Sequence, residues 1–369
     1  MKVKNFILEL LIIFECILAR TKFDSIQIGI EIVLILYFLF SCLNKIVNNK
    51  FYLLFLITFI FSSLIGLYTS TLEVFALNTK IYLLAFLSIV YFKTRKFDFF
   101  FLKYFMWLNM FVILYQVVFK TYLLSDFIDA YGSTFNSSYI RPIGLFLSPH
   151  ESMNVLAIYL LYEIYKGGGT YLRLLMVYFG EVTFVLASFF FQLCYYKFSL
   201  ILNFFKRVKF FLKATRKISL IIIGILFLLL FFAVNFSEDF KNFVVEYEWN
   251  FLSFALDPGR IFGIQVVLAQ FLDYKTYIQI FTLFPRDFNS IQDGFWHFAG
   301  NEIMYFQLIQ QGGLIVFILY MFLLLKFSNF FKFFILTSLF HYGDVITPLV
   351  ISMFVTYSSE INSQKNEKA

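Results

Sequence analysis

The sequence predicts an all-α polytopic integral membrane protein with about 12 transmembrane helices and a large outer loop before the last helices. Only 14% of the 369 residues are charged and 61% are hydrophobic, whereas soluble domains carry about 25% charged residues. Apolar runs of roughly 15 to 20 residues recur along nearly the whole chain, and one bilayer crossing needs about 20. We therefore expect residues 1–369 to form a single transmembrane domain.

The first expected span, residues 5–19, follows a basic start at Lys2 and Lys4. Glu9 and Glu15 interrupt its apolar part and no convincing cleavage site follows, so we interpret it as a span and not as a cleaved signal peptide. The next four spans are apolar runs separated by short polar connections. They cover residues 26–43, 51–68, 72–92 and 99–119.

Seven further apolar runs complete the expected bundle. They cover residues 152–165, 171–187, 188–205, 218–234, 303–325, 330–341 and 345–357. The second and third of these runs adjoin, and they could also be interpreted as one span. That alternative would reverse the orientation of everything that follows, so the charge pattern distinguishes the two interpretations.

The positions of Lys and Arg predict the orientation. With the N-terminus inside, most of these residues lie in or beside the inside connections, as the positive-inside rule requires. The basic loop of residues 206–217 would lie outside in the opposite orientation, and also if residues 171–205 formed one span. We therefore expect a cytoplasmic loop at 206–217 and two large outer loops at 120–151 and 235–302.

Charge and cysteine content narrow the possible partners. The net charge of +7 is explained by basic residues that border apolar spans, so we expect no nucleic acid as a partner. The mixture of basic and apolar residues at 206–217 would also suit a contact with anionic membrane lipid. Cys16, Cys42 and Cys194 lie far apart in expected spans, so no disulfide is implied.

The first outer loop ends in a segment that two prolines keep from being helical. Arg141 precedes Pro142 and His150 follows Pro149, so we expect both on a non-helical stretch before the sixth span. Irregular backbone at that depth is tolerated where it is buried in protein or lines a wet cavity. Arginine binds phosphate through a planar fork of hydrogen bonds. An arginine that only reaches the lipid headgroups is the alternative interpretation.

The second outer loop carries Arg260, Arg286 and His297. Arg260 lies in the first turn of a helical pattern, where backbone N–H groups also favour an anion. His297 is followed one helical turn later by Asn301 and then by Glu302. Histidine can take a proton from a sugar hydroxyl near neutral pH, although an interfacial histidine that only forms hydrogen bonds is the alternative.

The sequence has no pattern typical of a metal or nucleotide site. It contains no His-x-x-x-His, no cysteine pair with ligand spacing and no Asp-x-Asp in an outer loop. It also has no glycine-rich phosphate loop, because the glycines at 167–169 follow a span on the inside and are typical of a flexible turn. We therefore expect neither a metal nor a cofactor.

Three short groups of residues together carry a family resemblance. They are Arg141, Gly144, Phe146 and Pro149 at the start of one span, Gly259 and Arg260 at the start of a helix in the late outer loop, and His297, Asn301, Gly312, Gly313 and Leu314 before and within a later span. In these motifs and in its expected topology, the chain resembles the O-antigen polymerase and ligase superfamily. The Wzy-type polymerases are its closest members.

The resemblance implies glycosyl transfer at the outer face of the bacterial cytoplasmic membrane, with undecaprenyl-diphosphate-linked oligosaccharides as substrates and no cofactor. It implies that Arg141 and Arg260 hold the diphosphate and offset the charge on the leaving group, with Arg286 as a third contact. His297 would orient or deprotonate the acceptor hydroxyl. The supporting residues would be His150, Asn301 and Glu302. A chain-length regulator and a flippase are further partners in such a pathway.

Two positions depart from the family pattern. The family often has a Ser-Arg pair where this chain has Ser188 and Phe189, and its usual Pro-Asn is Pro149 and His150 here. Two alternatives to a polymerase stay open.

The sibling O-antigen ligase, which moves finished glycan to an acceptor, would fit the same motifs. A flippase or transporter would line its spans with charge, and the main ionisable residues within the spans are few. They are Glu31, Glu163, Glu181 and Lys197. The outer loops are richer in polar residues, so we expect a polymerase.

Overall fold

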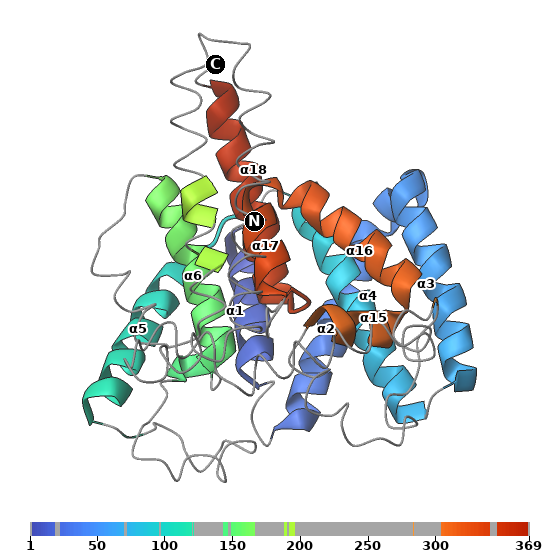
Figure 1. Cartoon of the computed structure of the whole chain (residues 1–369), viewed down its shortest axis with the longest axis horizontal. Helices are drawn as coiled ribbons and strands as arrows, with labels where there is room; N and C mark the ends of the chain where they lie inside the picture. The colour runs from blue at the N-terminus through green and yellow to red at the C-terminus, as the bar shows by residue number, and fades with distance from the viewer. Residues whose placement is uncertain are drawn as a thin grey trace, which may run out of the picture.

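The computed structural model of the chain is a bundle of α-helices (Figure 1). It describes residues 2–18, 23–69, 72–95, 97–119, 121, 143–146, 149–166, 188–189, 192–195, 283, 304–339 and 345–367. Within these ranges there is no β-strand. The expected all-helical fold is therefore confirmed for the described residues, and the total number of spans stays a prediction.

The helices match most of the expected spans. In chain order they are α1 (Lys2–Leu18), α2 (Asp24–Asn48), α3 (Lys50–Thr69), α4 (Leu72–Thr94), α5 (Leu102–Phe119), η2 (Gly144–Phe146), α6 (Pro149–Tyr165), α15 (Met304–Gly312), α16 (Leu314–Phe327), η5 (Asn329–Phe331), α17 (Lys332–Ser338) and α18 (Pro348–Glu367), where η denotes a short 3-10 helix. The helices α1 to α6 agree with the first six expected spans within a few residues at each end.

Four helical stretches in the described part are long and apolar enough to cross a membrane. They are Ser25–Asn48, Lys50–Tyr68, Phe75–Thr94 and Leu102–Phe119. A bent pair, Leu314–Phe327 with Asn329–Ser338, would add one more if it forms a single span. The apolar helices therefore indicate a membrane protein.

The outer surface of the bundle supports the same conclusion. Large apolar side chains such as Phe40 of α2, Leu64 of α3 and Phe111 of α5 point away from the protein and are exposed. Water disfavours contiguous apolar surface of this kind, whereas lipid tails do not. The exposed faces of α2, α3 and α5 are therefore suited to a bilayer.

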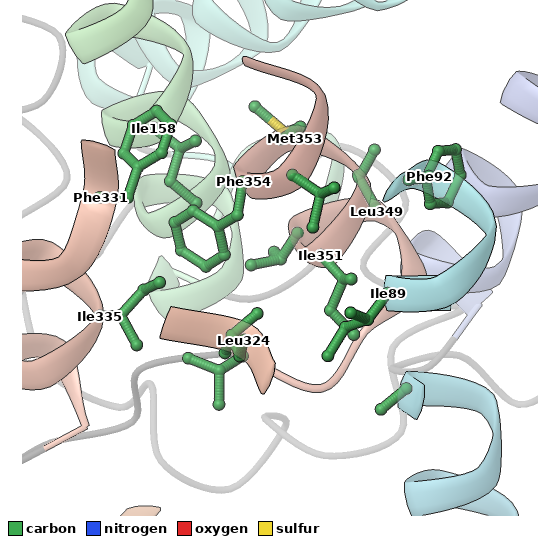
Figure 2. Close-up of a cluster of buried hydrophobic side chains, with 14 of the residues drawn as sticks. Ile89, Phe92, Ile158, Leu324, Phe331, Ile335, Leu349, Ile351, Met353 and Phe354 are labelled. Carbon is green, nitrogen blue, oxygen red and sulfur yellow. The ribbon is translucent and has the colours of Figure 1, made fainter. Parts of the chain in front are cut away.

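Helix α18 forms the centre of the bundle. It packs against α1, α4, α6, α16 and η5, and every residue from Pro348 to Ser358 is buried. Figure 1 shows α5 and α6 on one side of α18 and α3, α4 and α16 on the other. Figure 2 shows Phe354 of α18 beside Ile158 and Phe331. A helix with apolar residues on all sides is stable only when such neighbours surround it.

The C-terminal half of α18 differs from the expectation. The predicted span ended at residue 357 and was followed by an inside tail, but the helix continues to Glu367. Its last turns carry Ser, Gln, Asn, Lys and Glu, and Figure 1 shows them projecting beyond the neighbouring helices. These polar residues are good or tolerable helix formers, so the helix continues after the apolar run has ended.

Two expected spans near the C-terminus take another form. The span predicted at 303–325 is two helices, α15 and α16, separated at Gly313, whose φ of 79° cannot continue a helix. Residues 329–338 form η5 and the seven-residue α17, which is about 10 Å long and too short to cross a bilayer. The chain bends by 107° between α16 and this segment.

Candidate functional site

Most residues proposed from the sequence to act in a site lie outside the described residues. They are Arg141, Arg260, Arg286, His297, Asn301 and Glu302. His150, which we expected on a non-helical stretch, is instead the second residue of α6, because proline is tolerated in the first turn of a helix. Its side chain is likewise outside the described part. The outer loop 235–302 is described only at Leu283, and the basic loop 206–217 not at all. These assignments stay predictions.

The structure does describe the turn that follows Arg141 and Pro142, and polar side chains of α5 hold it in place. Gln116 Oε1 accepts hydrogen bonds from the backbone N–H groups of Ile143 and Gly144, both at 2.9 Å. Asn109 Oδ1 accepts the N–H of Leu145 at 2.7 Å. Gln116 and Asn109 are fully buried, so this non-helical backbone has its hydrogen bonds satisfied without water.

The resemblance motif residues Gly144 and Phe146 shape this turn, which we call the clamped turn (Ile143–Phe146). Gly144 has a φ of 64°, and a Cβ atom on it would lie under 3.0 Å from Asn109 Oδ1 and from Ser152 Oγ. Phe146 is fully buried against Phe105, with ring centroids 5.3 Å apart at 87°. A larger residue at Gly144 does not fit the turn that the other residues form.

The clamp also ties α5 to α6. Asn109 Nδ2 donates to Ser152 Oγ at 2.9 Å, so one amide contacts both the turn and the first turns of α6. Gln116 Nε2 is buried and has no hydrogen-bond partner. That donor lies on the side chain that fixes Ile143, two residues along the chain from Arg141.

A second polar region surrounds the break between α15 and α16. Gly312, the last residue of α15, lies so close to Tyr82 that a Cβ atom would be 2.7 Å from its ring. Tyr82 Oη donates to the Leu308 carbonyl at 2.6 Å, and Ser62 Oγ donates to the Gly312 carbonyl at 3.0 Å. Side chains of α3 and α4 therefore donate hydrogen bonds to the carbonyl groups at the end of the broken helix.

These three elements line a small hollow that is open on one side, which we call the α15 hollow. Its lining residues are Phe59, Ser62, Ser63, Gly66, Phe75, Asn78, Thr79, Gln311 and Gly312. The polar members are hydroxyl and amide side chains, and none is charged. Gly312 belongs to the third motif of the resemblance, so that motif contributes to this region.

An ion pair lies within the bundle beside this region. Lys80 Nζ of α4 is 2.5 Å from Glu31 Oε2 of α2, with side chains 21% and 5% exposed. Gln27 Nε2 donates to the other carboxylate oxygen of Glu31 at 3.3 Å. Ionisable residues inside membrane spans are rare and usually functional. Glu31 was recognised in the sequence, but Lys80 was not.

A second buried acid is structural. Glu9 of α1 is fully buried, and its carboxylate accepts the backbone N–H groups of Phe100, Phe101 and Leu102 at 3.0, 2.9 and 2.6 Å. These groups precede or begin α5 and have no partner within that helix. A negative charge also suits the positive end of the helix dipole. Glu9 therefore caps α5 and connects it to α1.

The ends of α6 and α18 are joined by a polar and aromatic cluster. Tyr162 Oη donates to the Glu360 carboxylate, and Lys166 Nζ lies 3.0 Å from Glu360 Oε2. Tyr162 and Tyr357 stack with centroids 3.7 Å apart. The ion pair is about one third exposed, so it adds little energy, and the stacked rings provide most of the contact.

Sequence reasoning missed Lys80, Gln116 and Asn109. The pairing of Lys80 with Glu31 had a signal, because each lies about two helical turns after the start of its helix, at Leu72 and Asp24. Helices that begin on the same side of a bilayer place such residues at similar depth. Gln116 and Asn109 had no such signal, since the turn they bind is fixed by tertiary contacts.

The fold and these polar regions define the class of the protein: a helical membrane protein with hydrogen-bonded polar residues inside its bundle. No protein-family model, curated protein or solved structure matches the chain. In the part of the chain that is described, no group of three or more His, Cys, Asp or Glu residues could hold a metal ion. All three cysteines are free thiols.

Proposed function

We propose that the chain is a polysaccharide polymerase that joins undecaprenyl-diphosphate-linked oligosaccharide repeat units into O-antigen or capsular polysaccharide at the outer face of the bacterial cytoplasmic membrane. The observation that carries this proposal is the clamped turn after Arg141 and Pro142. Two residues of the family resemblance, Gly144 and Phe146, form it. A simple crossing between two spans needs no buried non-helical turn with dedicated polar partners.

In the proposed reaction, an acceptor sugar hydroxyl attacks the anomeric carbon of the donor glycan. His297 takes the hydroxyl proton, and the bond between the anomeric carbon and the diphosphate oxygen breaks. Arg141 and Arg260 stabilise the negative charge that develops on the departing undecaprenyl diphosphate, and Arg286 adds a further contact. The diphosphate is already an activated leaving group, so the reaction needs neither nucleotide nor metal.

In this proposal, the clamped turn helps to orient the Arg141 side chain toward the diphosphate. A fork of hydrogen bonds from arginine recognises phosphate only when the side chain starts from a defined backbone position. Gln116 holds the Ile143 and Gly144 amides at 2.9 Å, which limits the motion of the chain that leads to Arg141. The same side chain carries the buried Nε2 donor, which could form one further hydrogen bond.

The test is a reconstituted reaction. The purified full chain in lipid vesicles is incubated with a lipid-linked repeat unit, and the products are separated on a gel. A ladder of lengths without added nucleotide sugar is expected from the wild type, Arg260→Ala should form none, and Arg141→Lys should be impaired because a point charge cannot replace the fork.

Arg95 provides matched controls for both substitutions. It is exposed at the end of α4, where it donates to the Ser41 carbonyl at 3.4 Å. Arg95→Ala and Arg95→Lys should both retain the ladder. Near-normal polymer from Arg260→Ala would show that Arg260 does not have the role in diphosphate binding that we assign to it. The absence of a ladder with the cognate repeat unit would contradict the proposed reaction.

Transport of a lipid-linked glycan is a second candidate, favoured by the Lys80–Glu31 pair and the helix break at Gly313. Broken helices and buried ion pairs both occur in transporter sites. If the vesicles form no ladder but move the labelled lipid-linked glycan between leaflets, and Glu31→Gln stops that movement, the transporter is the correct class. Transfer of glycan to an added lipid A core would instead identify the sibling ligase.

A further inference from the structure

The α15 hollow is chemically unusual for the interior of a membrane bundle. Five of its lining residues carry neutral polar side chains: Ser62, Ser63, Asn78, Thr79 and Gln311. Two aromatic rings complete its wall. A surface of hydroxyl and amide oxygens between three helices is expensive in an apolar setting unless a ligand or hydrogen bonds satisfy it.

One oxygen in this lining lacks a partner. Gln311 Oε1 is shielded from solvent and accepts no hydrogen bond from the residues that the structure describes, and such an acceptor costs about 1–3 kcal/mol when it stays unsatisfied. The neighbouring Ser62 hydroxyl cannot relieve it with its proton, because that proton is already donated to the Gly312 carbonyl at 3.0 Å. Gln311 Oε1 is therefore an acceptor oxygen in the lining that the Ser62 hydroxyl does not satisfy.

The broken helix adds negative potential at the same place. Helix α15 ends at Gly312, and the last carbonyls of a helix carry the negative end of its dipole. Figure 1 shows the short α15 beside α3 and α4. Unwound carbonyls and the C-terminal ends of half-helices coordinate Na⁺ at comparable breaks in membrane proteins.

Charge and size restrict the ligand further. Lys80 follows Thr79 in the chain, but its ammonium group is 2.5 Å from the Glu31 carboxylate, so that positive charge is already balanced. The hollow has room for about one water-sized ligand and not for a sugar ring. Neutral oxygens around a small space suit a small hard monovalent cation.

We propose that the α15 hollow binds one Na⁺ ion through the oxygens of Asn78, Thr79 and Gln311, and that the ion fastens the end of α15 to α4. The inference does not rest on the proposed glycosyl transfer, because each observation comes from the α3, α4 and α15 contacts alone. A bound ion stabilises the folded state that holds it. The melting temperature should therefore depend on Na⁺.

The experiment measures thermal unfolding of the purified full chain in detergent with a fluorogenic thiol reagent. Cys16 and Cys42 are buried and become reactive on unfolding. At constant ionic strength, Na⁺ in place of choline should raise the melting temperature saturably, by at least about 3 °C. Binding of radioactive ²²Na⁺ should show one site per chain, and K⁺ should compete weakly.

The variants Thr79→Val and Gln311→Leu each remove one oxygen with little change in shape, and each should raise the half-saturating Na⁺ concentration by about tenfold or more. Thr94→Val is the matched control, since Thr94 lies in the same helix and its hydroxyl donates to the Val90 carbonyl at 2.8 Å. It should keep the full Na⁺ response. If Thr79→Val does not accumulate, Asn78→Ala, which removes another of the three proposed oxygens, replaces it.

Three results would overturn the proposal. One is an equal rise with Na⁺, K⁺ and choline, which would show that only ionic strength matters. Another is no saturable rise in the wild type together with no ²²Na⁺ binding, as expected if the hollow holds a water molecule. The third is an unchanged Na⁺ response in both Thr79→Val and Gln311→Leu, which would place the ion elsewhere.

Discussion

Replacing Gly144 by alanine tests the clamped turn with the smallest possible change. The new methyl group would lie under 3.0 Å from Asn109 Oδ1 and from Ser152 Oγ, a separation that real Cβ atoms essentially never show. Both neighbours are buried and hydrogen-bonded to each other at 2.9 Å, so neither can move without losing a contact. The turn must therefore open or the clamp must break.

The loss of folding stability in Gly144→Ala has two contributions. A φ of 64° in the left-handed region costs an alanine about 1–2 kcal/mol. Displacing Asn109 would leave the partly buried Leu145 N–H without its acceptor at 2.7 Å, which costs about 1–3 kcal/mol. Together Gly144→Ala should destabilise the protein by about 2–5 kcal/mol, and its melting temperature should fall by at least about 4 °C.

The assay is the same thermal unfolding measurement in detergent, followed by the polymerisation reaction. Gly29→Ala is the matched control, because Gly29 lies in α2 with nothing within 4 Å of its Cβ position. Alanine is the better helix former by about 1 kcal/mol, so this variant should melt at or above the wild-type temperature. Adding Ser152→Ala to Gly144→Ala removes one clashing oxygen and should recover part of the loss.

A melting temperature of Gly144→Ala within 1 °C of the wild type, by the thiol assay, would refute the reasoning about the clamp. A stable Gly144→Ala protein with normal polymer would in addition separate the turn from the proposed activity. Loss of polymer without loss of stability would instead support a role of the turn in positioning Arg141.

Three further predictions concern the buried polar contacts. Glu31→Gln should lower the melting temperature more than the double variant Glu31→Gln with Lys80→Met. The single variant leaves the Lys80 ammonium group without its counter-ion, which costs more than removing both charges. An equal loss in both variants would contradict this reasoning. Glu9→Ala should destabilise by about 3 kcal/mol, because three backbone N–H groups lose a charged acceptor, and unchanged thermal unfolding would show that water replaces it. Gly312→Ala should destabilise by about 1–3 kcal/mol through the clash with the buried Tyr82 ring, and a wild-type melting curve would mean that the ring can move.

The first part of the fold could be predicted because apolar length decides it. Each of α2, α3 and α4 is a nearly continuous apolar run, and the structure begins and ends them within a few residues of the expected limits. A run of that kind has one low-energy solution in lipid, namely a helix that satisfies its own backbone. Such elements do not depend on their neighbours.

The region after residue 303 could not be predicted in the same way. Gln310 and Gln311 stand before Gly312 and Gly313, but apolar residues continue on both sides of them and no charged residue interrupts the run, so hydropathy predicted one span. The break occurs because Gly313 adopts a φ of 79° and Gly312 packs against Tyr82, a residue more than two hundred positions earlier. No local pattern contains that contact.

Part of the candidate site was predictable from residue types. Pro142 and Pro149 indicated a non-helical stretch before α6, and the structure has η2 there, with α6 starting at Pro149. The polar partners were not predictable, because Gln116 and Asn109 resemble ordinary polar residues in a span until the backbone N–H groups that donate to them are known. The roles of Arg260 and His297 stay predictions.

The sequence by itself determined that this is a helical membrane protein, since bilayer crossing depends on local length and hydropathy. It also indicated, through Pro142 and Pro149, the interruption before α6. Only the tertiary structure decided which polar groups meet: Glu9 with the start of α5, Lys80 with Glu31, and Gln116 with the clamped turn. The reason is physical. A buried polar group must find a partner, but the partner's identity depends on which helices pack together and at what depth.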